Sequence, residues 1–321
     1  MANKKKTLTR AQELERLLTT SYRTALWHRF AKACKTYELL SPGDKVCVCI
    51  SGGKDSMVMA LLFKHLHRYS DFPFDLKYVV MNPGYNKANL ELIKENLRTL
   101  EIPAVIVDTD IFEIANSVSE SPCYLCAKMR RGALYRIAKM WGCNKIALGH
   151  HYDDVIETTL MNMLNSGSFQ TMLPKLPSTN YDGMEVIRPM YLIREKDVVD
   201  FQNSNGLRFL RCACRFTEEK DLNESGQRKK TKALIAWLKE NYNPLVEKNI
   251  FKAAANVQLD KLVGYFEGGV EHSFLSDYEE NKQKQYQKIK ESDAEKKAIE
   301  KAEKEHREFK IDDSLEKEFG E

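Results

Sequence analysis

A short apolar segment followed by a glycine-rich turn and a helical pattern constrains the fold of this chain most. The apolar run Lys45–Ile50 is typical of a buried strand, and apolar residues recur at helical spacing from Met57 to Arg68. Between them lies the turn Ser51-Gly52-Gly53-Lys54-Asp55-Ser56. Glycines allow a sharp bend and a close approach to an anion, and a helix start offers unpaired N–H groups and a positive dipole end. The turn is therefore predicted to bind phosphate groups.

Strand-like and helical patterns alternate along the middle of the chain. Further strands are predicted at Leu76–Met81, Ala104–Asp108 and Lys145–Leu148, with helices at 87–100, 127–141 and 153–165. This repeated order implies an α/β fold, in which a parallel sheet is flanked by helices. Ligands of such sheets bind beyond the carboxyl ends of the strands, which is where the glycine-rich turn lies.

The remaining segments are predicted to extend this fold at both ends. Helical spacing predicts a helix within 9–40, which ends at a Ser-Pro-Gly-Asp turn, and further helices at 194–205 and 229–241. From Tyr278 onward the composition changes to Lys, Glu, Gln and Ala with few large apolar residues. The predicted organisation is an N-terminal helical region (1–40), an α/β domain with the phosphate-binding turn (41–215), a C-terminal helical region (216–277) and a charged helical or disordered tail (278–321).

Charge and hydropathy narrow the class of protein. Residues 278–321 carry 11 Lys and Arg against 14 Asp and Glu, so the formal charge of +4 for the whole chain becomes +7 on residues 1–277. That surplus suits a polyanionic partner. No apolar run is long enough to span a membrane, and the basic start, Met1 to Arg10, precedes no apolar stretch of the secretory kind. We expect a cytoplasmic protein without a membrane partner.

The glycine-rich turn is not a Walker A loop, because Asp55 follows Lys54 where that pattern requires Ser or Thr. An ordinary Gly-Gly turn between a strand and a helix is the alternative. In its context the hexapeptide resembles the signature of the PP-loop ATP pyrophosphatases. The resemblance implies that ATP adenylates a carbonyl or amide-like oxygen and that pyrophosphate is released. It also implies a phosphate-holding role for Ser51, Gly52, Gly53, Lys54, Asp55 and Ser56.

The chain contains eight cysteines, and four of them form two close pairs. Cys47 and Cys49 lie in the predicted strand, and Cys34 and Cys143 stand alone, so these four are predicted to pack as small apolar residues. The first pair, Cys123-x-x-Cys126, opens a basic helix, whose N-terminus and arginines favour thiolates.

The spacing of the second pair, Cys212-Ala213-Cys214, is too short for both sulfurs to ligate one ion without strain. Cys123, Cys126 and one of Cys212 or Cys214 are therefore predicted to hold a metal centre. Three ligands on a [4Fe–4S] cluster leave one iron open, and that iron could hold a sulfide. A structural zinc with four cysteine ligands and a catalytic persulfide are the alternatives.

An acidic motif follows the strand that ends at Leu148. Gly149, His150 and Asp153 are predicted to line the nucleotide, and Asp154 is predicted to handle a proton or a magnesium ion. Asp153 and Asp154 are also placed to cap the following helix. A capped helix with a charged first turn is the alternative interpretation of the same residues.

Together these motifs resemble the tRNA 2-thiocytidine synthetases over roughly residues 20–240. The resemblance rests on the hexapeptide, the first cysteine pair with Arg130-Arg131-Gly132, Gly149-His150-His151 with Asp153-Asp154, and Arg188-Pro189 with Arg194-Glu195-Lys196. One departure is Cys212-Ala213-Cys214, where that family has Cys-x-x-Cys. By the flanking Phe209-Leu210, Cys212 takes the ligating place, and Cys214 remains a catalytic candidate.

The resemblance implies an activity, cofactors and partners. It implies that a tRNA cytidine at position 32 is adenylated at C2 and converted to 2-thiocytidine, with ATP, Mg²⁺ and a [4Fe–4S] cluster. Asp55, Lys54, Asp154 and Cys214 are the catalytic candidates, and Arg130, Arg131 and Arg136 are candidates for the RNA backbone. A cysteine desulfurase or another sulfide donor is the implied partner besides tRNA, and the oligomeric state is left open between monomer and homodimer. Thiolation of a uridine, a PP-loop ligase such as a lysidine-type enzyme or NAD synthetase, and a binding module with structural zinc are the alternatives.

Overall fold

The computed structural model describes residues 8–117, 122–210, 226–276, 278–291, 296–297 and 299–301. The chain divides into two compact units, Met1–Ala255 and Asn256–Glu321, and each is considered by itself.

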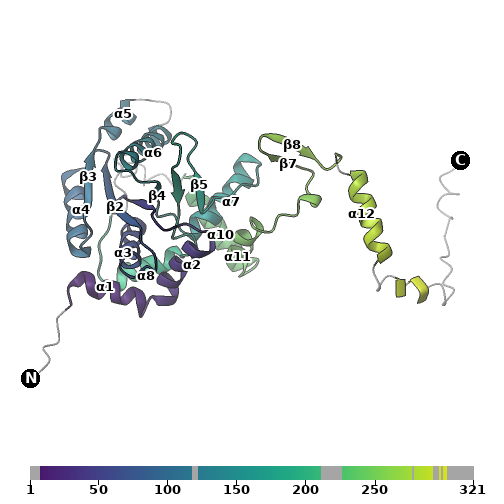
Figure 1. Ribbon diagram of the computed structural model, residues 1–321, viewed down its shortest axis with the longest axis horizontal. Helices are drawn as coiled ribbons and strands as arrows, with labels where there is room; N and C mark the ends of the chain where they lie inside the picture. The colour runs from purple at the N-terminus through teal and green to yellow at the C-terminus, as the bar shows by residue number, and fades with distance from the viewer. Residues whose placement is uncertain are drawn as a thin grey trace, which may run out of the picture. The chain divides into compact units, whose positions relative to one another are not determined.

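The first unit is built on a six-stranded sheet (Figure 1). Its strands are β1 (Lys45–Ile50), β2 (Asp75–Asn82), β3 (Ala104–Asp108), β4 (Lys145–Ala147), β5 (Lys175–Pro177) and β6 (Glu185–Ile187). They lie in the order β3-β2-β1-β4-β6-β5, and all pairs are parallel except β5 with β6. The predicted parallel sheet is confirmed, and the three-residue strands β5 and β6 are additions to it.

The strand order places a switch point between β1 and β4. From β1 the chain proceeds to β2 and β3 on one side, and it returns to β4 on the other side of β1. The loops that follow β1 and β4 therefore leave the same edge of the sheet in opposite directions. That geometry is where open α/β sheets bind their ligands.

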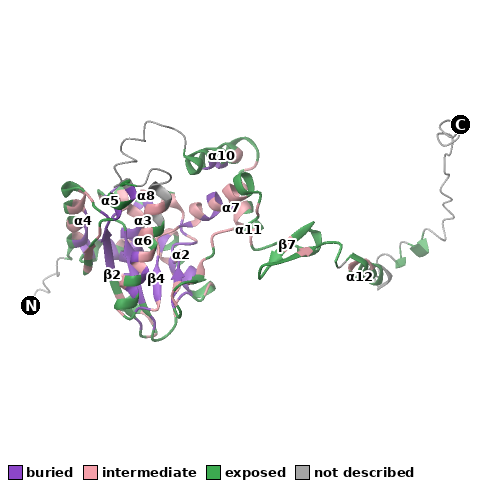
Figure 2. Cartoon of the chain, turned by 90° about the horizontal axis from the view of Figure 1, so that it is seen from above, coloured by how far each residue is buried: buried purple, intermediate pink, exposed green. Residues whose placement is uncertain are grey.

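Helices cover both faces of this sheet. They are α1 (Arg10–Thr19), α2 (His28–Thr36), α3 (Lys54–Tyr69), α4 (Lys87–Leu100), α5 (Ile111–Ser117), α6 (Pro122–Met140), α7 (Tyr152–Ser166), α8 (Glu195–Ser204), α10 (Gln227–Asn241) and α11 (Val246–Ala253). Val46 and Val48 of β1 pack with α3 and α8 on one face, and Cys47 and Cys49 pack with α6 on the other. Figure 2 shows that buried residues concentrate in the strands and in the helices against them.

The predicted packing role of four cysteines is confirmed. Cys34, Cys47, Cys49 and Cys143 are all buried. Burial raises the pKa of the Cys34 thiol to about 12, which keeps it protonated. These thiols are part of the apolar core of the described chain.

The N-terminal helical pattern forms three pieces instead of one continuous helix. Helix α1 ends at Thr19, a π-helical turn follows at Arg23–Trp27, and α2 begins at His28. The break coincides with Thr19, Thr20 and Ser21, whose side chains compete for backbone hydrogen bonds. Both Thr19 and Thr20 donate their hydroxyl hydrogens to the carbonyl oxygen of Arg16.

The second unit has a different character. It contains a 3-10 turn (Leu259–Lys261), the hairpin β7 (Gly264–Glu267) and β8 (Val270–Ser273), and α12 (Tyr278–Glu291). Gly268 and Gly269, at φ +59° and +85°, form the hairpin turn within the segment predicted to be helical. None of its described residues is buried. In neither unit do the described helices include one that is both long and apolar enough to cross a bilayer.

Candidate functional site

Glycine gives the loop after β1 its shape. Gly52 has φ +86°, in the left-handed region, and a Cβ there would lie 2.8 Å from both Ile93 Cγ1 and Leu210 Cδ1. Any other residue would therefore be strained and would clash with the side chains beneath the loop. The residue at the N-cap of α3, Gly53, makes no side-chain cap. The first N–H groups of α3 thus remain available to an anion.

Two serines fix the loop internally. Ser56 is buried, donates its hydroxyl hydrogen to the carbonyl oxygen of Gly53 (2.9 Å) and accepts from the backbone N–H of Ser51 (3.1 Å). The Tyr85 hydroxyl donates to the carbonyl oxygen of Ser51 at 3.1 Å. The loop is therefore held in its conformation by contacts of its own residues and of the chain after β2.

The loop after β4 lies directly against the start of α3. A Cβ on Gly149 would come within 3.2 Å of the backbone nitrogen of Ser56 and 3.3 Å of the carbonyl carbon of Asp55. Only a residue without a side chain allows this approach without a shift of backbone. The acidic motif after β4 and the glycine-rich turn after β1 therefore lie at the same edge of the sheet.

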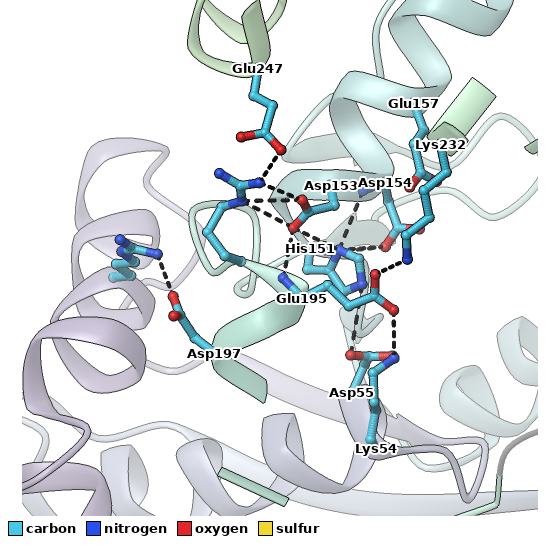
Figure 3. Close-up of polar contacts among 12 residues, drawn as sticks. Lys54, Asp55, His151, Asp153, Asp154, Glu157, Glu195, Asp197, Lys232 and Glu247 are labelled. Carbon is cyan, nitrogen blue, oxygen red and sulfur yellow. Dashed lines mark hydrogen bonds and ion pairs between the residues drawn. The ribbon is translucent and has the colours of Figure 1, made fainter. Parts of the chain in front are cut away.

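Lys54 and Asp55 form the charged part of the loop after β1 (Figure 3). Lys54 Nζ lies 3.0 Å from Asp55 Oδ2 and 3.1 Å from Glu195 Oε1. Burial alone would lower the pKa of Lys54, but the two carboxylates outweigh it and raise that pKa. The other carboxylate oxygen of Asp55, Oδ1, is buried and accepts no hydrogen bond from the described residues. A buried carboxylate oxygen of this kind is suited to a cation such as Mg²⁺.

Helix α7 begins with a capping box that differs from the predicted one. The N-cap is His151, whose Nδ1 accepts from the N–H of Asp154 (3.3 Å), while Asp154 Oδ2 accepts from the N–H of His151 (2.9 Å). The prediction that Asp153 and Asp154 cap the helix is thus wrong in its residue assignment. An imidazole nitrogen supplies the cap acceptor, and Asp154 takes the reciprocal third position.

Asp153 anchors α8 to α7. Its carboxylate accepts from Arg194 at 2.8 to 3.2 Å and from the backbone N–H of Glu195 at 2.7 Å, and Arg194 also reaches Glu247 of α11 at 2.6 Å. Although burial opposes it, these donors lower the pKa of Asp153. Nucleotide binding by Asp153 stays a prediction. In the described chain its oxygens hold the start of α8.

Helix α10 brings two cations to the acidic side of the site. Arg228 Nη1 lies 2.9 Å from Asp154 Oδ1 and 3.0 Å from Glu157 Oε2, and Lys232 Nζ donates to Glu195 Oε2. Burial raises the pKa of Glu157 against the opposing effect of Arg228. No local sequence pattern predicts these pairs, because Arg228 and Asp154 are 74 positions apart.

His150 is a neutral imidazole within the site. Burial, with Arg188, Arg228 and His151 nearby, lowers its pKa to about 4 in spite of Asp154. Its Nδ1 has no hydrogen-bond partner among the described residues, and neither has the buried Nε of Arg188. Both groups can hydrogen-bond to a ligand at the carboxyl ends of β4 and β6.

The predicted metal ligands lie partly outside the described residues. Cys123 and Cys126 both belong to the first turns of α6, three positions apart and thus on one helical face, and Cys126 is half-buried. The side chain of Cys123, together with Cys212 and Cys214, lies outside the described part. The N–H of Leu210 donates to Gly52 O at 3.1 Å, so the described chain stops beside the glycine-rich loop, two residues before Cys212 in the sequence.

The arrangement suits the binding and activation of a nucleotide. It combines an uncapped helix start, a lysine, an unsatisfied aspartate oxygen and neutral imidazole within one edge of the sheet. Among the residues that the structure describes, no three His, Cys, Asp or Glu side chains are arranged to hold a metal ion by themselves. Mg²⁺ commonly relies on few carboxylates and completes its shell with substrate phosphates and water.

Comparisons with known proteins find one family model and several similar proteins. Residues 23–214 match the family model of the PP-loop domain. The chain is 37% identical over 237 residues to a tRNA-cytidine(32) 2-sulfurtransferase of Citrifermentans bemidjiense, which covers 73% of this chain and 91% of that protein. It is 35% identical over 250 residues to the protein of the same name from Geotalea uraniireducens, covering 75% and 96%.

A solved structure shares the fold. The U34-tRNA thiolase NcsA from Methanococcus maripaludis, determined with its [4Fe–4S] cluster, matches with a TM-score of 0.57 and 22% sequence identity. The match covers 75% of this chain and 80% of that one.

Proposed function

Because this chain belongs to the PP-loop family of tRNA-cytidine(32) 2-sulfurtransferases, we propose that it is an ATP-dependent enzyme that converts cytidine 32 of a tRNA into 2-thiocytidine. The observation that carries the proposal is the contact of two loops at the switch point. The glycine-rich loop and Gly149 lie against each other there, which brings anion donors and acidic side chains together. A uridine substrate remains the alternative.

ATP is expected to bind with its phosphates at the loop Ser51–Ser56. The left-handed Gly52 allows close approach, the uncapped start of α3 offers N–H groups, and Lys54 supplies a positive charge. Asp55 is our candidate for contact with the Mg²⁺ that accompanies ATP, because its buried Oδ1 accepts no hydrogen bond from the described residues, with His151 Nε2 3.8 Å away. These features fit a pyrophosphate leaving group as well as bound ATP.

Adenylation is the first proposed step. The C2 oxygen of the base attacks the α-phosphorus, the bond from that phosphorus to the bridging oxygen breaks, and pyrophosphate leaves toward the loop. Lys54 and the N–H groups of α3 stabilise the negative charge that pyrophosphate carries away. Asp154 is our candidate for holding a proton or a metal ion during the step, with its carboxylate oriented by Arg228 and the N–H of His151.

Sulfur insertion is the second proposed step. A sulfide equivalent adds to C2, and AMP leaves with the former C2 oxygen. A [4Fe–4S] cluster, when bound, would supply this sulfide equivalent, and Cys123, Cys126 and Cys212 are the proposed ligands. Cys123 and Cys126 are three positions apart in the first turns of α6, a spacing that suits two ligands of one cluster. The Methanococcus thiolase of the same fold was solved with such a cluster.

The proposal is tested on protein purified without oxygen. Iron and sulfide content and visible absorption are measured, and tRNA nucleosides are analysed by mass spectrometry after reaction with ATP and sulfide. We expect stoichiometric iron and ATP-dependent 2-thiocytidine. Colourless protein that holds stoichiometric zinc would contradict the proposed cluster. Formation of 2-thiouridine would show that the substrate is a uridine and not cytidine 32.

Two variants separate the two steps. Asp55→Ala is expected to lose ATP-dependent thiolation while it retains iron, and Cys123→Ala is expected to lose both iron and thiolation. Pyrophosphate release with tRNA present should persist in Cys123→Ala, because adenylation does not need the sulfur. Thiolation at the wild-type rate in either variant contradicts the role assigned to that residue.

A further inference from the structure

Glu195 lies between a lysine of the glycine-rich loop and a lysine of α10. Lys54 Nζ is 3.1 Å from Glu195 Oε1, and Lys232 Nζ donates to the other oxygen, Oε2. Figure 3 shows Lys54 and Lys232 reaching the Glu195 carboxylate from different sides. The predicted site residues did not include Glu195 or Lys232.

The carboxylate of Glu195 is held in place by its surroundings. Its backbone N–H donates to Asp153 Oδ2 at 2.7 Å, and its neighbour Arg194 pairs with the same aspartate. Although burial opposes it, the two lysines lower the pKa of Glu195 to about 2. Glu195 therefore remains an anion at a fixed position at the start of α8.

Because the Glu195 carboxylate pairs with Lys54, it must compete with the phosphates of ATP for the Lys54 ammonium group. Lys54 is the first residue of α3 and directly follows Gly53, so a phosphate bound at the loop approaches the same ammonium group. When Lys54 turns to a phosphate, Glu195 loses one of its two cations. An unpaired, three-quarters-buried carboxylate is unfavourable, and Lys232 is the described cation that remains to neutralise it.

On the basis of the proposed function, we propose that Glu195 and Lys232 are positioning residues that control Lys54 by an exchange of partners. In the absence of nucleotide, Glu195 holds Lys54 in place. When ATP binds, Lys54 moves to the phosphates, and Lys232 keeps Glu195 neutralised. The C-terminal helical region thereby contributes to nucleotide binding without touching the nucleotide.

ATP affinity of the full-length protein, measured by calorimetry without tRNA, tests the exchange. Lys232→Met is expected to weaken ATP binding about fivefold, the upper range for a half-exposed ion pair, because Glu195 then competes more strongly for Lys54. Glu195→Gln is expected to bind ATP at least as tightly as the wild type, because an amide competes weakly for an ammonium group.

The double variant separates this exchange from a structural role. In the Glu195→Gln background, Lys232→Met has no charge to neutralise and should change ATP affinity less than about twofold. The same fivefold loss in both backgrounds would overturn the proposal, since Lys232 would then act on the phosphates directly or through folding.

Lys239→Met is the matched control. Lys239 also lies on α10 and is similarly exposed, but it pairs with Glu247 at 2.8 Å. We expect ATP affinity to be unchanged in this variant, and an equal loss here would overturn the proposal.

Failure of the wild type to bind ATP contradicts the proposed function itself. Wild-type binding with Lys232→Met unaffected overturns only the exchange.

Discussion

The two loops that meet at the switch point of the sheet are held by different interactions. The loop after β1 depends on the backbone conformation of Gly52 and on hydroxyl contacts of Ser51 and Ser56. The start of α7, which follows the loop after β4, is instead tied by ion pairs to Arg194 at the N-cap of α8 and to Arg228 of α10, and Arg194 in turn pairs with Glu247 of α11. The first loop therefore contains most of what fixes its shape, whereas the second depends on residues of helices later in the chain.

The largest effect is expected where the two loops touch. In Gly149→Val, the added side chain would push against the backbone of Asp55 and Ser56, so the start of α3 must shift. Displacement of catalytic groups by about 1 Å can cost about 100-fold in rate. ATP-dependent thiolation should fall by about that factor, as measured by tRNA nucleoside analysis.

Gly167→Ala is the control for this prediction. Gly167 ends the same helix, α7, and no atom lies within 4 Å of an added Cβ there. Its positive φ makes alanine moderately destabilising, by about 1 kcal/mol. Activity of the folded protein should be retained, and equal activity in Gly149→Val would show that the loops do not need this contact.

A smaller effect is expected when only the charge of Asp154, at the start of α7, is removed. Asp154→Asn preserves an oxygen that can accept from the N–H of His151 but removes the ion pair with Arg228. If Asp154 holds a proton or metal ion in adenylation, pyrophosphate release should slow by about 100-fold or less. The exposed Asp71→Asn serves as the control, and equal rates for both variants would exclude a chemical role of this charge.

Acid should remove the stability that the ion pairs of Glu195 contribute. The lysines lower the pKa of Glu195 from 4.5 to about 2, so its contribution to stability is complete above about pH 4.5 and is lost as pH falls toward 2. The wild type should exceed Glu195→Gln in unfolding free energy by about 1 kcal/mol at neutral pH. Urea unfolding at a series of pH values should show this difference shrinking below about pH 4.5, and a constant difference would contradict the ion-pair origin.

The smallest effect is expected outside both loops. Arg131 is exposed on α6, on the helix that begins with the first cysteine pair. If Arg131 contacts the RNA backbone, Arg131→Gln should weaken tRNA binding a few-fold. It should also reduce the slope of log affinity against log salt concentration by about the amount of one phosphate contact. ATP affinity should not change, and a loss of ATP binding would place Arg131 among the residues that support the loops.

Much of the sheet could be predicted because its strands are buried and parallel. Strands β1 and β3 agree with the predicted ranges, since each is a short apolar run. Strand β1 is buried along most of its length, whereas β3 is an edge strand in which Val105 is 52% exposed. Strands β5 and β6 have only three residues each, which is too short for a periodic pattern. The β7–β8 hairpin did have a signal in its Gly268-Gly269 turn between β-forming residues.

In the site, too, motifs formed by neighbouring residues could be predicted, whereas contacts between residues far apart in the sequence could not. Residues within the glycine-rich loop and the acidic motif could be predicted because neighbouring positions in the sequence form each motif. The partners of these motifs could not, because Lys54 and Glu195 are 141 positions apart and no spacing rule connects them. His151 as the cap of α7 also escaped prediction, since Ser, Thr, Asp and Asn are the usual cap residues.

The burial of Cys34, Cys47, Cys49 and Cys143 has a consequence for selectivity in sulfur chemistry. Packing these four side chains inside the protein protects them sterically from thiol-modifying reagents. The raised pKa of Cys34 and of Cys47 also keeps these two thiols protonated, which makes them poor nucleophiles. A thiol-specific alkylating reagent should therefore leave all four unmodified in the native protein and react with them only after unfolding.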